Sequence, residues 1–122
     1  RVAARRNLDE ALLATGIPFS GRPGHAQFLK ELHQVSARVA GVRRFGSAAL
    51  DIAWVAAGRY DAYWERGVKP WDVAAGLLLV AEAGGKVTSA DVAEGDALHA
   101  GSVLASNLEL HPVVLERLRA AA

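Results

Sequence analysis

Apolar residues along this chain follow helix spacing in some stretches and form short strand-like runs in others. Between residues 28 and 39 they recur every three or four positions with charged residues between them, which predicts a surface helix ended by Gly41. Residues 48–57 and 73–83 are apolar on nearly every side, and Pro112 opens a last amphipathic helix. A helix without a polar face must be covered on most sides. Residues 48–57 and 73–83 therefore also predict a further layer of structure beyond this chain.

Short segments between the predicted helices have the composition of strands. The predicted strands are residues 10–15, 42–45, 60–65, 86–89 and 102–106. The first run also suits a helix, because periodicity alone does not separate the two for so short a segment. In the third, Tyr63 and Glu65 share one face and Trp64 lies on the other. A Gly- and Asp-bearing turn region separates the last two strands. Helices that alternate with strands predict an α/β fold, a layered sheet flanked by helices.

Composition narrows the class of protein. With 122 residues, 52% hydrophobic and 22% charged, the chain suits one folded domain and differs from disordered sequences. The net charge of +1 gives no strong field, so we expect no direct binding to nucleic acid. Gly, Asp or Glu interrupts the longest apolar stretches well before the roughly 18 to 20 residues that a membrane span needs, so we expect no membrane insertion. The absence of cysteine excludes disulfides and thiolate chemistry and fits the cytoplasm. No methionine occurs and the first residue is Arg1, which predicts a piece of a longer polypeptide.

Polar residues stand at the edges of several predicted elements. Gly46 and Ser47 precede a helix, so free N–H groups and a hydroxyl are available for an anion or a hydroxylated ligand. Asp72 stands in the first turn of the next helix, where the helix dipole keeps a carboxylate ionised and suited to a hard cation. Glu65, at the end of a strand, can approach the same place. Plainer interpretations remain open here: a helix cap, an N-terminal helix charge and a solvated strand-end acid.

The same region resembles the C-terminal signature of the inositol monophosphatase family. The specific part is Trp-Asp-Val-Ala-Ala-Gly at residues 71–76, followed by Glu-Ala-Gly-Gly at 82–85. Gly-Ser-Ala-Ala at 46–49 is similar to another family segment. Leu-Ala-Thr-Gly at 13–16 and Ala-Ser-Asn at 105–107 match weaker landmarks, so the resemblance covers nearly the whole chain.

This resemblance implies a role for each edge residue. Asp72 would be a magnesium ligand and would also lie near the substrate hydroxyls. Glu65 stands seven residues before it, as the substrate-contacting acid of the family does, and would hydrogen-bond a ring hydroxyl. Gly46, Ser47 and Ala48 would line the polyol side of the pocket, mostly through backbone groups. None of the residues of this chain would be the nucleophile.

The family also implies a fold and a reaction. Residues 1–122 would be the C-terminal half of an αβαβα sugar-phosphatase fold, with the N-terminal metal-binding half absent from this sequence. The reaction would be Mg²⁺-dependent hydrolysis of a phosphate monoester, with inositol 1-phosphate as the expected substrate. Fructose 1,6-bisphosphate, histidinol phosphate and phosphoadenosine phosphate remain open, although Glu65 favours a polyol. Because the chain lacks the Asp-Pro-x-Asp-Gly-Thr motif and the Gly-Asp…Glu segment that supply most metal ligands, we expect this fragment alone to be inactive.

Partners other than a sugar or polyol phosphate follow from weaker signals. A regulatory protein-binding module remains open, because some bacterial relatives associate with the transcription machinery. Arg43 and Arg44 are interpreted as a solubilising strand edge or a subunit contact, with phosphate binding as the alternative. The family segment near them often lies close to a dimer interface, so we expect a homodimer. The histidines lack metal-ligand spacing and are interpreted as surface or capping residues: His25, His33, His99 and His111.

Overall fold

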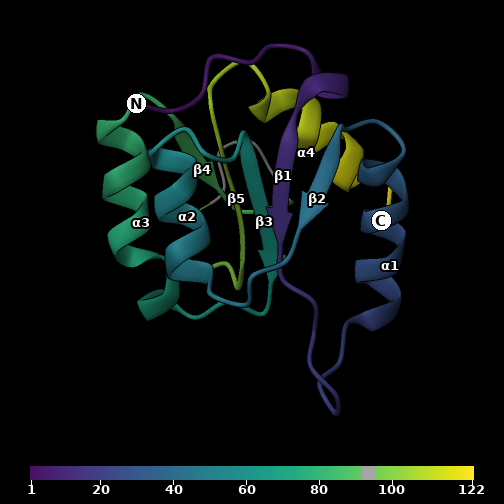
Figure 1. Ribbon diagram of the computed structural model, residues 1–122. Coiled ribbons are helices and arrows are strands. Elements are labelled where there is room, and N and C mark those ends of the chain that lie inside the picture. The colour runs from purple at the N-terminus through teal and green to yellow at the C-terminus, as the bar shows by residue number, and fades with distance from the viewer. Residues whose placement is uncertain (92–95) are drawn as a thin grey trace.

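The computed structural model describes residues 1–91 and 96–122 and contains a five-stranded sheet covered by helices on both faces (Figure 1). The elements are the 3-10 turn η1 (Leu8–Glu10), β1 (Leu12–Thr15), α1 (His25–Ser36), β2 (Gly41–Arg43), α2 (Ala48–Ala56), β3 (Ala62–Arg66), α3 (Pro70–Glu82), β4 (Lys86–Thr88), β5 (Ser102–Ser106) and α4 (His111–Arg119). Residues 92–95 of the predicted turn region lie outside the described residues. The α/β prediction is confirmed.

The parallel pairing of the strands determines at which edge of the sheet the helices begin. The order in the sheet is β2-β1-β3-β5-β4, with β1 parallel to β2 and to β3. β5 is antiparallel to both β3 and β4. Parallel strands need a connection that carries the chain back across the sheet, and α1 and α2 provide these crossovers. As a result, α2 and α3 both begin at the edge where β1 and β3 end (Figure 1).

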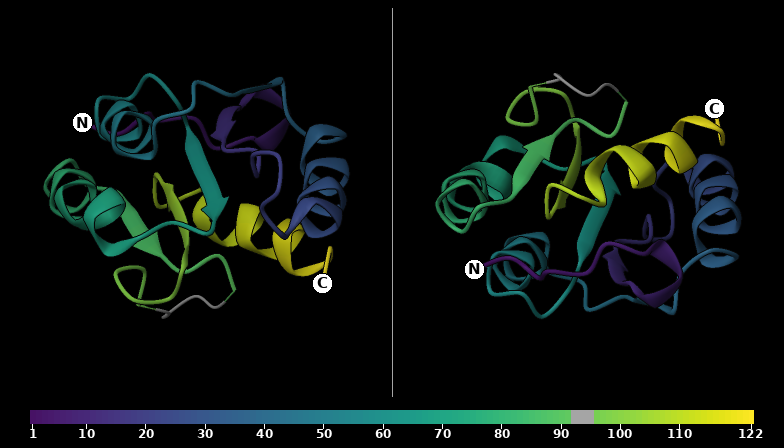
Figure 2. Two further views of the ribbon diagram at one scale, coloured as in Figure 1. Left: turned by 90° about the horizontal axis from the view of Figure 1, so that it is seen from below. Right: turned by 90° about the horizontal axis from the view of Figure 1, so that it is seen from above.

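Alternating strand residues divide the core into two faces. On the α1/α4 face, Leu13 and Trp64 are buried with residues of α1 and α4. On the α2/α3 face, the adjacent Ala14 and Tyr63 are buried with residues of α2 and α3. Seen along the helices, one pair of helices lies on each side of the sheet (Figure 2). The predicted separation of Tyr63 from Trp64 on β3 is confirmed, since side chains alternate along a strand.

The structure settles one open alternative and corrects one predicted helix end. The run that suited either strand or helix is strand from Leu12 to Thr15, and it is preceded by the turn η1. The helix predicted to reach Gly41 ends at Ser36 instead. The Ala40 N–H donates to the carbonyl of Ala11 at 3.0 Å, so the chain leaves the helix and joins the sheet before β2. Sheet pairing therefore ends the helical pattern that the spacing of apolar residues had suggested.

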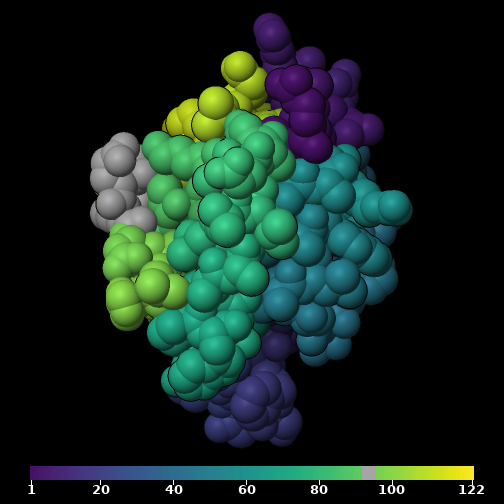
Figure 3. Space-filling view, turned by 90° about the vertical axis from the view of Figure 1, so that its left-hand side faces the viewer, coloured from purple at the N-terminus to yellow at the C-terminus, as the bar shows by residue number. Residues whose placement is uncertain are grey.

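The helices α2 and α3 lie in close contact. A Cβ on Gly76 would stand 2.3 Å from Cγ2 of Ile52, so only glycine allows this approach. Their outward surface stays apolar, and Figure 3 looks onto it with α3 in front and α2 beside it. Its exposed large apolar residues are Leu50, Trp71, Leu78 and Leu79. In residues 1–91 and 96–122, no helix has the length and apolar composition that crossing a membrane requires.

Candidate functional site

The residues predicted to bind metal or substrate come together at one edge of the sheet. Glu65 lies near the end of β3, and Asp72 lies in the first turn of α3. Gly46 and Ser47 immediately precede α2, which begins at Ala48. In open α/β sheets, the edge beyond the ends of the parallel strands is where ligands commonly bind. The fold thus gathers all five residues from three chain segments.

Ser47 caps α2. Its hydroxyl accepts a hydrogen bond from the Leu50 N–H at 3.3 Å, so the plain capping interpretation is confirmed. Gly46 has a φ of 87°, a conformation that favours glycine, and both residues are exposed. The N–H groups of Ala48 and Ala49 come before the first intrahelical hydrogen bond, so they can still bind an anion or a hydroxyl oxygen.

Asp72 binds the backbone at the start of α3. Its Oδ2 accepts from the Lys69 N–H at 2.8 Å, and the Asp72 N–H donates to the Lys69 carbonyl at 2.9 Å. Asp72 is therefore a charge at the N-terminus of α3, as the plainer interpretation held. The side chain is half-buried and its charge acts on the carboxyl of Glu65, so the two acids share one electrostatic environment.

Glu65 is a half-buried acid held by a neighbour on its own strand. The hydroxyl of Tyr63 donates to its Oε1. Burial raises the pKa of the Glu65 carboxyl, and the nearby Asp72 raises it too, whereas the Tyr63 hydrogen bond and the charge of Arg22 oppose that rise. Glu65 is thus not the freely solvated strand-end acid that was the alternative, and it is poised near the other predicted site residues.

Asp51 of α2 is a buried acid that motif reasoning missed. It is 1% exposed, and neither carboxylate oxygen has a hydrogen-bond partner among the described residues. Burial, with the nearby Glu65, raises its pKa to about 6, against the effect of Arg44. The signal in the sequence was a lone acid in an otherwise apolar helix. A carboxyl group whose pKa is raised this far is typical of functional regions, although structural networks also produce it.

Arg44 lies at the site, whereas Arg43 turns back toward its own strand. Nη1 of Arg44 stands 3.5 Å from where a Cβ on Gly46 would be, and its charge acts on both Glu65 and Asp51. Nη1 of Arg43 donates to the Val42 carbonyl at 3.2 Å. Arg44 is therefore the arginine of this pair whose charge acts on Glu65 and Asp51.

The described residues do not form a magnesium site by themselves. Among residues 1–91 and 96–122, no group of three or more His, Cys, Asp or Glu side chains could hold a metal ion. Mg²⁺ takes six oxygen ligands in a tight octahedron, and Asp72 already uses one oxygen to cap its helix. A single carboxylate falls far short of six oxygen ligands, so further carboxylates would have to come from elsewhere.

The histidines take no part at this edge. His25 and His33 are exposed, and His99 pairs with Asp96 at 2.9 Å on the surface. The surface interpretation is wrong for His111, which is 2% exposed and lies between Thr88 and Ser106. Its Nε2 is 2.9 Å from the Thr88 hydroxyl and its Nδ1 is 2.8 Å from the Ser106 hydroxyl. Strand pairing brings these hydroxyls together, which single-residue spacing could not reveal.

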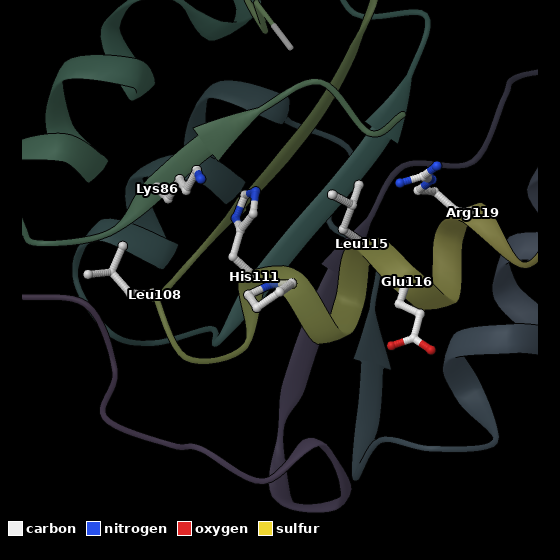
Figure 4. Close-up of a pocket in the computed structure, with 7 residues that line it drawn as sticks. Lys86, Leu108, His111, Leu115, Glu116 and Arg119 are labelled. Carbon is white, nitrogen blue, oxygen red and sulfur yellow. The ribbon is translucent and has the colours of Figure 1, made fainter. Parts of the chain in front are cut away.

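A separate groove of about 540 Å³ runs between β4 and α4 (Figure 4). Lys86 and His111 line it together with Leu115 and Arg119. It contains none of the residues predicted to bind metal or substrate. The groove is therefore distinct from the edge described above.

Known proteins resemble this chain along its whole length. Residues 1–122 match the model of the inositol monophosphatase family. An inositol-1-monophosphatase of Caulobacter vibrioides is 68% identical over 99% of this chain and 47% of its own length. The Nus factor SuhB of Pseudomonas aeruginosa is 41% identical over 98% of this chain and 44% of its own length. The crystal structure of the extragenic suppressor protein suhB from Bartonella henselae matches with a TM-score of 0.92 and 45% identity, covering 98% of this chain and 45% of that one. The chain spans less than half the length of these relatives and corresponds to their C-terminal half.

Proposed function

Because this chain belongs to the inositol monophosphatase family, we propose that it is the C-terminal subdomain of a magnesium-dependent phosphatase that hydrolyses inositol 1-phosphate. The supporting observation is the meeting of Glu65 and Asp72 with the start of α2 at one sheet edge. This arrangement suits a polyol phosphate. One acid can accept hydrogen bonds from ring hydroxyls, the free N–H groups can donate to the ligand, and the second acid can bind a cation. Residues 1–122 carry the substrate side of the site in this proposal.

The magnesium site would be completed by residues from outside this chain. Asp72 would hold Mg²⁺ through one carboxylate oxygen, and an N-terminal half would supply the other acids. The family is generally metal-dependent. When bound, a divalent ion polarises phosphate oxygens, activates a water molecule and stabilises the leaving alkoxide. Residues 1–122 alone are therefore expected to be inactive, because one carboxylate is a weak magnesium site.

Replacing Asp72 in the full-length protein tests this proposal. We expect Asp72→Asn to lower kcat/KM for inositol 1-phosphate by roughly 100-fold or more. Calorimetric titration should also show weaker Mg²⁺ binding. The matched control is Asp96→Asn, which changes an exposed carboxylate on the 96–101 turn and should leave both measurements unchanged. Unchanged turnover in Asp72→Asn would rule out the metal role.

The choice of substrate depends on Glu65. A carboxylate that accepts from ring hydroxyls favours polyol phosphates over esters that present few hydroxyl groups. We expect Glu65→Gln to raise KM for inositol 1-phosphate more than KM for phenyl phosphate. Assays with fructose 1,6-bisphosphate, histidinol phosphate and phosphoadenosine phosphate decide between the related activities, and a higher kcat/KM for any of them would replace inositol 1-phosphate as the substrate.

A protein-binding role is the second candidate. It is favoured by a relative named Nus factor SuhB that is 41% identical. A hydrolase needs the carboxylate of Asp72, whereas a binding module does not. Complementation of a deletion strain with Asp72→Asn separates the two, because rescue by a protein without phosphatase activity would assign the phenotype to binding.

We also propose a homodimer and a cytoplasmic location. The exposed Phe45 packs against Trp54 and Tyr60 beside Arg43 and Arg44, which gives a mixed aromatic and basic surface suited to a subunit contact. Sedimentation of the full-length protein should give a dimer, and Arg43→Glu should weaken it. The lack of cysteine fits the cytoplasm.

A further inference from the structure

Tyr63 and Glu65 lie on the same face of β3, where the phenol reaches the carboxylate. Residues two apart on a strand share a face, and the Tyr63 hydroxyl donates to Oε1 of Glu65. The Tyr63 side chain is completely buried among core residues such as Val55 and Val73 of α2 and α3. Its ring therefore has one position, and its hydroxyl holds one oxygen of Glu65 in place.

Tyr63 acts as a hydrogen-bond donor throughout the physiological pH range. Burial raises the pKa of its phenol far above the ordinary value, and the carboxylates of Glu65, Asp51 and Asp72 raise it further. A protonated phenol has one O–H to donate, and Oε1 of Glu65 receives it. Among the described residues, no hydrogen bond is made to Oε2 of Glu65, so that oxygen retains its capacity to accept.

Gly16 leaves space for the same carboxylate from the neighbouring strand. A Cβ on Gly16 would stand 2.1 Å from both Cδ and Oε1 of Glu65. The hydroxyl of Thr15 donates to the Trp64 carbonyl at 2.8 Å, which ties the end of β1 to β3 beside this contact. The carboxylate thus lies across the end of β1 in a position that any side chain at residue 16 would occupy.

We propose that Tyr63 is a positioning residue that, with the space left by Gly16, fixes Glu65 so that its second oxygen accepts from a hydroxyl of the substrate. The inference rests on the proposed function, because it assigns Glu65 to the polyol. It adds the residue that orients this acid and so sets the preference for hydroxylated substrates. A fixed acceptor loses less entropy on binding than a mobile one does.

The test compares two substrates in the full-length protein. Inositol 1-phosphate carries ring hydroxyls, whereas phenyl phosphate has none. We expect Tyr63→Phe to raise KM for inositol 1-phosphate by about 10-fold, to change kcat by less than about 2-fold, and to leave phenyl phosphate kinetics unchanged. Equal losses on both substrates would reveal a merely structural effect and overturn the inference.

The matched control is Tyr60→Phe. Tyr60 is also buried, at 4% exposure, but its hydroxyl has no hydrogen-bond partner among the described residues. The same chemical change should leave both substrates unaffected there. A loss with Tyr60→Phe as large as that with Tyr63→Phe would show that removing any buried hydroxyl has this effect, and would contradict the specific role.

Two further variants separate the inference from the proposed function. If Glu65→Gln leaves KM for inositol 1-phosphate unchanged, the polyol role of Glu65 fails, and the inference fails with it. If Glu65→Gln raises KM but Tyr63→Phe does not, only the inference fails. In the Tyr63→Phe/Glu65→Gln double variant we expect the same KM as in Glu65→Gln alone, because Tyr63 acts through Glu65. If the increases in KM from the two changes were additive in the double variant, the inference about Tyr63 would be overturned.

Gly16→Ala disturbs the carboxylate from the other side and covers the case in which Tyr63→Phe does not fold. We expect it to raise KM for inositol 1-phosphate by about 10-fold or more while phenyl phosphate stays unchanged, since the new methyl must displace the carboxylate. Thermal unfolding identifies the variants that keep the native fold. A folded Gly16→Ala protein with normal KM for both substrates would contradict the proposed geometry.

Discussion

The helices on the two faces of the sheet differ in what they expose. Along α1, the exposed positions include His25, Lys30 and His33, with Leu29 as the one large apolar exception. Along α3, most exposed positions are apolar, and Leu78 is 64% exposed. Surface helices normally turn a polar face to water, so α1 is built as an outer helix and α3 as an inner one. The predicted site lies at the end of the inner pair.

Buried acids on the two faces differ in the same way. Glu31 of α1 is 1% exposed, and its Oε2 accepts from Nε of Arg66 at 2.7 Å. Asp51 of α2 is equally buried, and neither oxygen is hydrogen-bonded by a described residue. A buried charge normally has a partner, so the α1/α4 face satisfies its acid and the α2/α3 face leaves one unsatisfied. Both comparisons associate the predicted site with the face that needs further structure.

The largest effect should come from placing a charge on α3. In the full-length protein, we expect Leu78→Asp to lower the free energy of unfolding by about 3 kcal/mol or more, because an N-terminal half would cover this residue and bury the charge. Leu29→Asp on α1 is the matched control, since Leu29 is 62% exposed and Leu78 is 64% exposed. It should cost less than about 0.5 kcal/mol.

Urea denaturation of the two variants measures this difference. If both changes cost little, α3 remains an outer helix in the full-length protein, and the distinction between the two faces disappears. A large loss confined to Leu78→Asp would identify the α2/α3 face as an internal surface.

A smaller effect is expected at the crossing of α2 and α3. Gly76→Ala introduces a methyl 2.3 Å from Cγ2 of Ile52, and overpacking should lower the free energy of unfolding by about 2 kcal/mol. Ile52→Ala in the same protein removes the clashing atom, so the losses from the two changes should be less than additive. Additive losses in a denaturation experiment would mean that the helices separate more easily than their close contact suggests.

Local patterns in the sequence predicted much of the fold. The apolar run that predicted a helix at 48–57 matches α2, and the expected cap at Ser47 is confirmed by its bond to the Leu50 N–H. Both depend on interactions within a few residues, which spacing encodes. The predicted end of α1 was wrong because Val39 continues the apolar spacing beyond the last helical residue. The hydrogen bond from the Ala40 N–H to the carbonyl of the distant Ala11 instead joins this segment to the sheet.

The candidate site was predictable only in part, for the same reason. Helix starts and strand ends placed Asp72 and Glu65 at one edge, and the two-residue spacing of Tyr63 and Glu65 put both on one face of β3. The role of Gly16 depends on the pairing of β1 with β3, and the burial of Asp51 depends on how α2 packs in the fold. Neither follows from residue spacing, because both depend on contacts between segments far apart in the sequence.

The smallest effect expected here compares the two buried acids by one chemical change. The pKa of Asp51 is raised from 3.8 to about 6, so its charged form destabilises the folded state, and stability should fall as pH rises through this range. Asp51→Asn removes that charge. We expect the variant to unfold like the wild type below about pH 4 and to be more stable by about 1 kcal/mol above pH 6, since an amide keeps part of the desolvation cost.

The same acid-to-amide change should have the opposite sign at Glu31. Glu31→Gln removes a charge that is hydrogen-bonded to Arg66, so the variant should be less stable than the wild type at neutral pH. Urea denaturation of the full-length proteins between pH 4 and pH 8 measures both variants. If Asp51→Asn also lost stability above pH 6, a donor from the rest of the protein would have to pair with Asp51. The unsatisfied acid would then belong to the isolated subdomain alone, and the α2/α3 face would be completed electrostatically as well as sterically by the structure that covers it.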